Sequence, residues 1–152
     1  MSSEKDKALI ELKVFKEFAE RVQLPIKLES IRKPGGRSDP DIFCTFHNGE
    51  DVAFELVEIC ASDIAVHISK LSEACISTSD PTEEIILNKI TKSKNYRTQL
   101  PIELLCYTNA RVVSPDDLII AVAQRCATLI EGRFRKIWLL GEKGVYEVWK
   151  TP

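Results

Sequence analysis

The chain lacks any long apolar run. Its apolar stretches fall short of the ~20 residues that a membrane-spanning helix requires, and its N-terminal residues, MSSEKDKALIELK, are charged throughout. That segment also lacks the continuous apolar stretch of a secretion signal. These absences predict a cytoplasmic protein without a membrane partner.

Closely spaced cysteines and histidines are also missing. The five cysteines stand singly, without a Cys-x-x-Cys pair, and the chain has only two histidines. Zinc sites are usually built from such closely spaced ligands. A zinc centre is therefore not expected, and the cysteines are interpreted as reduced thiols packed in the core.

The chain lacks an excess of charge of either sign. Its 21 Lys and Arg residues nearly balance 23 Asp and Glu residues, which leaves a net charge of -2. Attraction of the whole chain to nucleic acid is therefore not expected, so any such contact needs a local basic patch. The length of 152 residues, 44% of them hydrophobic, suits one core, and a single domain over residues 1–152 is predicted.

Apolar periodicity and turn residues predict a mixture of helices and strands. Helices are expected over residues 6–23, 64–76, 82–97 and 114–132. Strands are expected over residues 26–31, 41–46, 52–59, 101–108, 134–141 and 144–150. A run of three strands followed by helical crossovers predicts an α/β fold with a mixed central sheet flanked by helices.

Two acidic residues occupy unusual positions in the predicted hairpin. Asp41 opens its first strand, and Glu55 lies inside its apolar second strand. If the turn pairs Phe46 with Val52, Asp41 lies about two residues beyond Glu55 along the sheet. A carboxylate buried there needs a cation, a donor or a metal, because burial without a partner is costly.

Two interpretations of these acids stay open. Neighbouring carboxylates repel each other unless a cation lies between them, and Mg²⁺ binds one or two carboxylates while keeping several waters. Alternatively, Asp41 caps the preceding turn and Glu55 pairs with a lysine from a covering helix.

The pattern resembles the PD-(D/E)xK nuclease superfamily. Asp39-Pro40-Asp41 matches the first half of its motif, and the FELVE stretch containing Glu55 matches the second half. The predicted element order corresponds to the αβββαβ core of the restriction-endonuclease-like fold, here with an extra C-terminal helix and hairpin. The likeness extends over residues 8–140 and implies a nuclease that hydrolyses phosphodiester bonds in nucleic acid, with DNA favoured over RNA and a homodimer possible.

The resemblance assigns roles to individual residues. Asp41 and Glu55 would hold Mg²⁺ or Mn²⁺, and an acid on the first helix would complete the site. Glu11 and Glu17 are the candidates for that acid, and Glu11 is preferred.

One motif residue departs from the family pattern. Val57 stands where the family has the lysine that helps to orient or activate water. Lys89 and Lys92 lie three residues apart on a predicted helix, so both share one side of it, and either could supply the missing ammonium. The alternative is a catalytically inactive relative that binds nucleic acid or another protein.

Basic residues gather in three short stretches. They predict phosphate contacts around a metal site, although a solvated helix face would produce the same pattern. The proposed nucleic-acid contacts are Arg37, Lys89, Lys92, Tyr96 and Arg97, and a further cluster comprises Arg133, Arg135 and Lys136.

Overall fold

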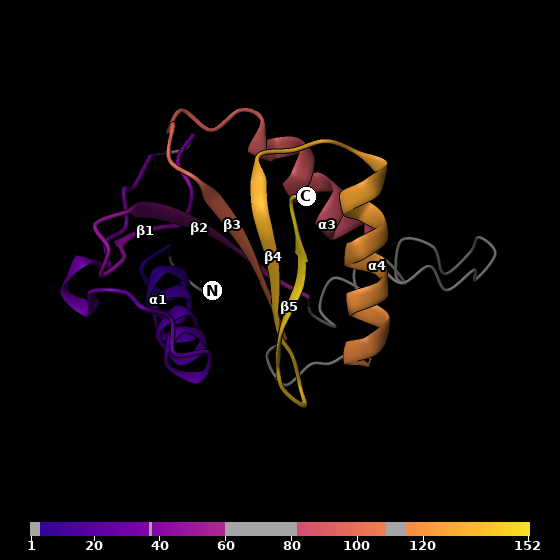
Figure 1. Cartoon of the computed structure of the whole chain (residues 1–152), viewed down its shortest axis with the longest axis horizontal. Coiled ribbons are helices and arrows are strands. Elements are labelled where there is room, and N and C mark those ends of the chain that lie inside the picture. The colour runs from indigo at the N-terminus through magenta and orange to yellow at the C-terminus, as the bar shows by residue number, and fades with distance from the viewer. Residues whose placement is uncertain (1–3, 37, 60–81, 109–114) are drawn as a thin grey trace.

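A computed structural model describes residues 4–36, 38–59, 82–108 and 115–152. The described chain forms three α-helices, one short 3₁₀ turn and five strands (Figure 1). In order, they are α1 (Glu4–Arg21), η1 (Leu28–Ser30), β1 (Ile42–Thr45), β2 (Asp51–Glu58), α3 (Thr82–Ser93), β3 (Ile102–Tyr107), α4 (Asp116–Leu129), β4 (Phe134–Leu140) and β5 (Val145–Lys150).

The five strands form one sheet in the order β1-β2-β3-β4-β5. The outer pairs, β1–β2 and β4–β5, are antiparallel, whereas β2, β3 and β4 run parallel to one another. Strand β3 is buried along its whole length, as expected for the continuous apolar run IELLCY at the centre of a parallel sheet. The predicted α/β fold with a mixed sheet is therefore confirmed.

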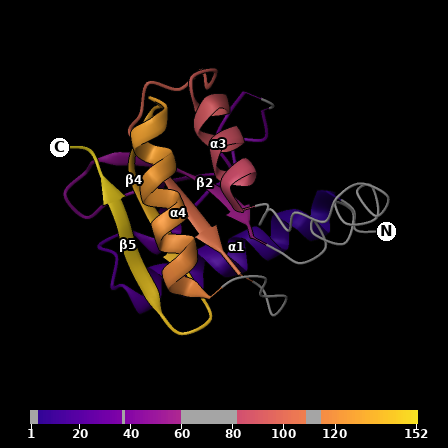
Figure 2. The same ribbon diagram turned by 90° about the vertical axis from the view of Figure 1, so that its right-hand side faces the viewer.

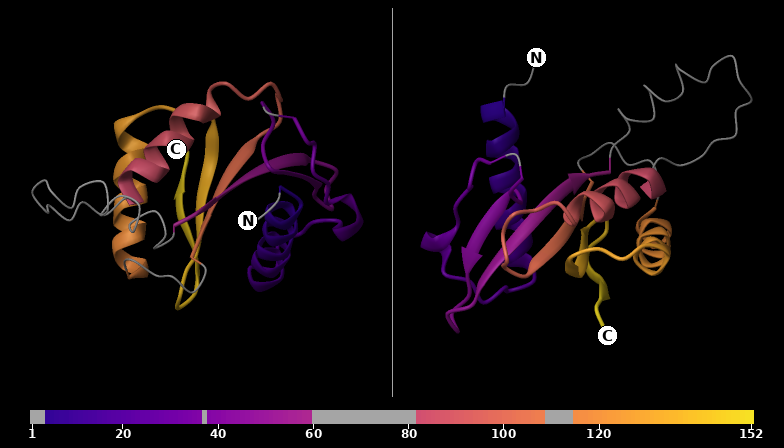
Figure 3. Two further views of the ribbon diagram at one scale, coloured as in Figure 1. Left: turned by 180° about the vertical axis from the view of Figure 1, so that it is seen from behind. Right: turned by 90° about the horizontal axis from the view of Figure 1, so that it is seen from above.

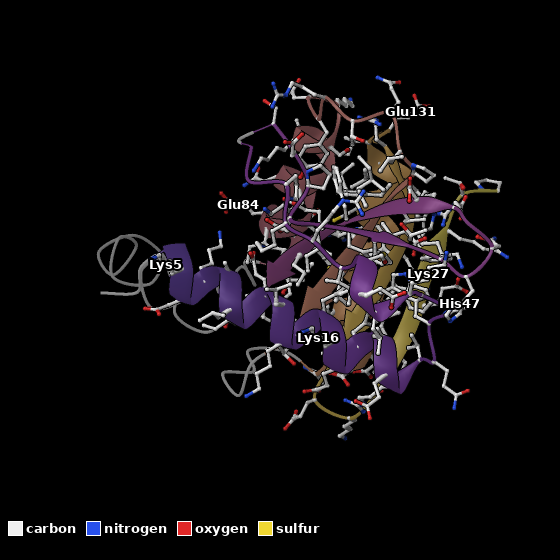
Figure 4. The ribbon with its side chains drawn as sticks, turned by 90° about the vertical axis from the view of Figure 1, so that its left-hand side faces the viewer. Lys5, Lys16, Lys27, His47, Glu84 and Glu131 are labelled. Atoms are coloured by element: carbon white, nitrogen blue, oxygen red, sulfur yellow. The ribbon has the colours of Figure 1, made fainter. Side chains whose placement is uncertain are left out.

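Helix α1 covers one face of the sheet. Phe15 and Phe18 lie three residues apart on α1, so both point to the same side. Their rings lie 4.9 and 6.0 Å from the ring of Phe54 on β2, and all three side chains are fully buried. The exposed Lys16 lies on the side of α1 that is turned away from the sheet (Figure 4).

Helices α3 and α4 cover the opposite face, where they lie side by side (Figures 2 and 3). Ile86 and Ile90 of α3, together with Ile119 and Ala123 of α4, are buried in one apolar cluster with the central strands. The sheet is thus the middle layer of three, and a side chain on β2 faces either α1 or α3 according to its parity.

The strand expected over residues 26–31 is absent, which is a correction to the sequence prediction. Its place is taken by η1 and by two isolated bridges, Ile26 to Phe46 and Arg32 to Phe43. The side-chain oxygen of Ser30 accepts the backbone N–H of Thr45 at 2.8 Å. A side chain thus replaces a backbone partner there, and the expected three-strand meander has only two strands.

The other described predictions differ mainly at element ends. The helix expected over 82–97 ends at Ser93, where the Ser93 hydroxyl donates to the carbonyl of Ile90 at 2.6 Å. The helix expected over 64–76 lies outside the described residues. No described helix combines the length and the apolar character that crossing a membrane would require.

Candidate metal and catalytic site

The turn between β1 and β2 is tighter than the strand pairing that was expected from the sequence. The backbone N–H of Phe46 donates to the carbonyl of Glu50 at 2.8 Å, so Phe46 does not pair with Val52 as expected. Gly49 has a φ of +89°, a conformation that glycine adopts without strain, and the Asn48 side chain accepts the N–H of Glu50 at 2.9 Å. The predicted register is therefore wrong by two residues.

The corrected register brings the two suspected acids together. Phe43 pairs with Ala53 rather than with Glu55, so Asp41 lies beside Glu55 instead of near Val57. The backbone N–H of Asp41 donates to Oε1 of Glu55 at 3.2 Å. Residues that are 14 positions apart in sequence are thus in contact at the end of the β1–β2 ladder.

Glu55 is a buried carboxylate with a lysine partner. It is 2% exposed and faces α3, from which the Nζ of Lys89 reaches its Oε2 at 2.9 Å. Burial by itself would raise the pKa of Glu55, but the charge of Lys89 and the surrounding hydrogen bonds hold that pKa below its usual value. Glu55 is therefore an anion at neutral pH.

The pKa of Asp41 is shifted in the opposite direction to that of Glu55. Its Oδ2 accepts the backbone N–H of Leu56 at 2.9 Å, which fixes the carboxylate against β2. Burial, reinforced by the negative charges of Glu55 and Glu11, raises the pKa of Asp41 to about 7. The site thus holds more negative charge than its lysines neutralise.

Of the two acids proposed on α1, Glu11 lies at this site. It is 5% exposed, and its charge is close enough to raise the pKa of Asp41. The Nζ of Lys33, from the loop before β1, lies 2.8 Å from its Oε1. Glu17 is exposed and forms a 3.5 Å ion pair with Arg21 on the same helix.

The two candidate lysines are in different environments. Lys89 contacts Glu55, whereas Lys92, one turn later on α3, is exposed. Val57 follows Glu55 on the same face of β2 and packs against the cluster beneath α3. On this face of β2, the ammonium that contacts Glu55 therefore belongs to Lys89.

Tyr96, proposed as a nucleic-acid contact, is inside the protein. It is 5% exposed, and its hydroxyl is buried beside the carboxylate of Glu55. Burial and the nearby negative charge of Glu55 raise the pKa of this phenol above its usual value, so the hydroxyl stays protonated. Tyr96 thus faces the carboxylates rather than the solvent.

The proposed surface contacts are only partly described. Arg97 is exposed, its Nη2 lies 3.7 Å from Oδ2 of Asp39, and its backbone N–H donates to the carbonyl of Ser38 at 2.9 Å. These contacts connect the loop before β1 to the segment after α3. Arg37 lies outside the described residues.

The basic residues near β4 form hydrogen bonds and ion pairs within the protein. Arg133 donates to the carbonyls of Tyr96 at 2.8 Å and of Thr98 at 2.6 Å, so it holds the segment after α3 in place. Lys136 forms a 2.9 Å ion pair with Glu147 on β5. These residues therefore contribute to the packing of the segment after α3 and of β5.

A second buried acid, Glu103, was not expected from the sequence. Glu103 on β3 is 2% exposed, and it accepts hydrogen bonds from Nε of Arg135 at 2.8 Å and from Nε1 of Trp138 at 2.7 Å. Arg135 also donates to both carboxylate oxygens of Glu50, at 3.1 and 3.2 Å. Like Glu55, Glu103 is an acid inside a mostly apolar strand, here IELLCY. The sequence pattern could therefore have revealed Glu103 as well.

The described residues hold no cluster of three or more Asp, Glu, His or Cys side chains arranged to bind a metal ion. Asp41 and Glu55 instead form a two-carboxylate group, with Glu11 nearby but paired to Lys33. One or two carboxylates suffice for Mg²⁺, which keeps several water ligands.

No protein-family model, curated protein or solved structure matches this chain. Its function is therefore inferred from its own residues.

Proposed function

We propose that this chain is a metal-dependent nuclease of the PD-(D/E)xK kind, with a restriction-endonuclease-like fold. In this proposal Asp41 and Glu55 hold Mg²⁺ or Mn²⁺. Lys89 supplies the ammonium of the motif lysine, whose position in the sequence is occupied by Val57. The observation that carries the proposal is the contact of Asp41 with Glu55 beside the Lys89 ammonium.

The donor set suits a hard divalent cation. Two carboxylates supply the oxygen ligands that Mg²⁺ and Mn²⁺ prefer. Burial, together with the negative charges of Glu55 and Glu11, raises the pKa of Asp41, and a bound cation would offset those charges. The buried hydroxyl of Tyr96 provides a further polar group beside Glu55. When bound, such an ion activates water and stabilises the charge that develops on phosphate.

Each side chain then has a distinct task. The backbone N–H of Asp41 and the Lys89 ammonium fix the orientation of the Glu55 carboxylate. Lys89 has a flexible stem and one carboxylate contact, so its ammonium can also donate a hydrogen bond to an oxygen of the substrate. The exposed Lys92 and Arg97 flank this region and would contact backbone phosphates.

Cleavage assays with matched variants test the catalytic proposal. Plasmid DNA, single-stranded DNA and RNA would be incubated with Mn²⁺ or Mg²⁺. We expect wild type to cut, and Asp41→Asn to lose at least about a hundredfold in rate, because metal stabilisation of the transition state amounts to several kcal/mol. Asp51→Asn changes an exposed acid on the same hairpin and should cut like wild type. Equal cleavage by Asp41→Asn would rule out this site.

The role of Lys89 has its own test. Lys89→Ala should slow cleavage by about a hundredfold, whereas Lys16→Ala, at an exposed position on α1, should change it by less than about threefold. Introducing Val57→Lys into the Lys89→Ala protein should restore part of the rate, since it returns an ammonium to the same face. If both lysine variants behave alike, Lys89 has no special function.

An inactive nucleic-acid-binding protein is the alternative, and one observation favours it. The 2.9 Å ion pair between Lys89 and Glu55 already neutralises one of the two acids. This alternative predicts salt-dependent binding of DNA or RNA without Mn²⁺ binding or cleavage. Calorimetric titration with Mn²⁺ separates the two proposals directly.

A further inference from the structure

Arg32 and Phe43 form a cation–π contact at the edge of the sheet. The guanidinium carbon of Arg32 lies 5.5 Å from the centre of the Phe43 ring. The two backbones also pair, because each residue donates its N–H to the carbonyl of the other, at 2.9 and 2.8 Å. This double hydrogen bond fixes the Arg32 backbone beside β1, the first strand in the sheet order (Figure 1).

The Arg32 side chain is exposed and holds its guanidinium without an acidic partner. Its Nη1 donates to the carbonyl of Ser30 at 3.2 Å, and none of the ion pairs within the described part of the chain involves Arg32. A second cation–π contact joins Lys136 to Trp138, but that ammonium is already paired with Glu147 at 2.9 Å. Arg32 is therefore an exposed planar cation that can bind a ligand without first breaking an ion pair with a described residue.

The stacked pair lies on the same face of the sheet as the candidate carboxylates. Phe43 pairs in register with Ala53, which precedes Glu55 by two residues on β2. Side chains two residues apart on a strand share a face and are separated by about 7 Å along it. Phe43 also packs against the apolar cluster beneath α3, the helix from which Lys89 reaches Glu55. A nucleotide bound at Arg32 and Phe43 is therefore a near neighbour of the proposed metal site.

We propose that Arg32 and Phe43 form a stacking site for one unpaired nucleobase of a single-stranded nucleic-acid substrate. Proteins that bind single strands stack bases on aromatic rings and on arginine guanidinium planes, and this pair offers both groups together. A base inside a duplex is already stacked on its neighbours and reaches such a plane only after unstacking. The inference rests on the nucleic-acid substrate of the proposed function and narrows it to a single-stranded segment.

Charge-conserving variants separate stacking from a simple phosphate contact. A lysine attracts phosphate as an arginine does, but it lacks the guanidinium plane. Arg32→Lys should therefore weaken binding of a single-stranded oligonucleotide about tenfold and leave the salt dependence of binding unchanged. Phe43→Leu removes the ring and should weaken binding by a similar factor. Arg125→Lys makes the matched replacement at an exposed arginine of α4 that is paired with Glu83, and it should bind like wild type.

The experiment measures fluorescence anisotropy with labelled single-stranded DNA, single-stranded RNA, a DNA duplex and an abasic single strand. EDTA is present, so that cleavage does not interfere with binding. Arg32→Lys should bind the duplex and the abasic strand as tightly as wild type does, because neither presents a free base to the stacking site. Its loss should be equal for single-stranded DNA and RNA, which share the base plane. Circular dichroism confirms that each variant is folded, and Arg32→Lys decides the result if Phe43→Leu is not.

The outcomes distinguish the inference from the proposed function. The stacking site is overturned if Arg32→Lys binds the normal single strand as tightly as wild type, or if it loses as much affinity for the abasic strand. A loss confined to RNA would indicate a contact with the 2′-hydroxyl and would also overturn it. If wild type still cleaves with Mn²⁺ in any of these cases, the proposed function stands without the stacking site. If wild type binds no nucleic acid, both fail together.

Discussion

Two strand carboxylates, one on β2 and one on β3, are equally buried yet have different surroundings. Glu55 and Glu103 are each 2% exposed and each has a basic partner. They face opposite sides of the sheet, because Glu103 pairs in register with Phe54, the neighbour of Glu55. Burial and ion pairing alone therefore do not separate a structural acid from a candidate functional one.

Glu103 accepts its hydrogen bonds from two side chains of β4. One of its oxygens accepts from Arg135 and the other from Trp138. The guanidinium of Arg135 is also bound to both oxygens of Glu50, and such a rigid fork fixes geometry better than an ammonium does. This network joins β3 and β4 to the turn before β2.

The surroundings of Glu55 are less balanced. A second carboxylate, Asp41, lies against it and a third, Glu11, lies nearby, while Lys33 and Lys89 supply the cations. Three acids with two lysines leave one formal negative charge. The comparison indicates that crowded carboxylates with a flexible lysine, rather than burial, mark this part of the sheet as the functional candidate.

The largest expected difference between the two acids is in catalysis. Glu55→Gln should reduce metal-dependent cleavage at least about a hundredfold, whereas Glu103→Gln should leave the rate of the folded protein within about threefold. Single-turnover cleavage with Mn²⁺ measures both rates, and circular dichroism confirms folding. A comparable loss in both variants would remove the distinction.

The next difference is in stability without metal. Arg135→Met leaves Glu103 and Glu50 without their cation and should cost about 3 kcal/mol of unfolding free energy. Lys89→Met should cost only about 1 kcal/mol, because Glu55 and Asp41 can then share a proton. Urea unfolding in EDTA measures both values, and a larger loss for Lys89→Met would contradict the comparison.

The pH dependence of stability should also differ. Asp41 has a pKa of about 7 in the folded chain against an ordinary 3.8. The folded state therefore keeps a proton that the unfolded state loses from about pH 4 upward, so this group lowers stability as the pH rises to 7. Asp41→Asn should remove the penalty and gain about 2 kcal/mol at pH 8 relative to wild type, with a smaller gain at pH 5.

Urea titrations at both pH values, in EDTA, test this sign. Glu103→Gln provides the contrast, since it disrupts a satisfied network and should destabilise at both pH values. Wild-type stability that rises between pH 5 and pH 8 by more than in Asp41→Asn would contradict the assignment.

The smallest expected effect concerns the exposed rim of the candidate site. The side chain of Arg97 is 71% exposed and its contact with Asp39 is 3.7 Å long. Arg97→Ala should therefore change unfolding free energy by less than about 0.5 kcal/mol. It should weaken DNA binding about threefold at low salt and reduce the salt dependence of binding, as measured by fluorescence anisotropy. An unchanged salt dependence would exclude Arg97 as a phosphate contact.

Several predictions could be made from local patterns because their causes are local. The apolar periodicity of residues 6–23 predicted the α1 helix, and the mostly apolar run around Glu103 predicted a central strand. The failures had non-local causes. Ser30 replaces a strand partner of Thr45 through a side-chain hydrogen bond, and the tight turn at Gly49 shifts the hairpin register by two residues.

The sequence by itself determined that acids stand inside apolar strands and that the residue two positions after Glu55 is the apolar Val57. Those facts depend only on residue order and the two-residue strand period. Tertiary structure decided that Asp41 meets Glu55, that Lys89 rather than Lys92 reaches them, and that Tyr96 is turned inward. Strand register, helix rotation and the hold of Arg133 on the Tyr96 backbone set these contacts, and each arises only when distant segments pack together.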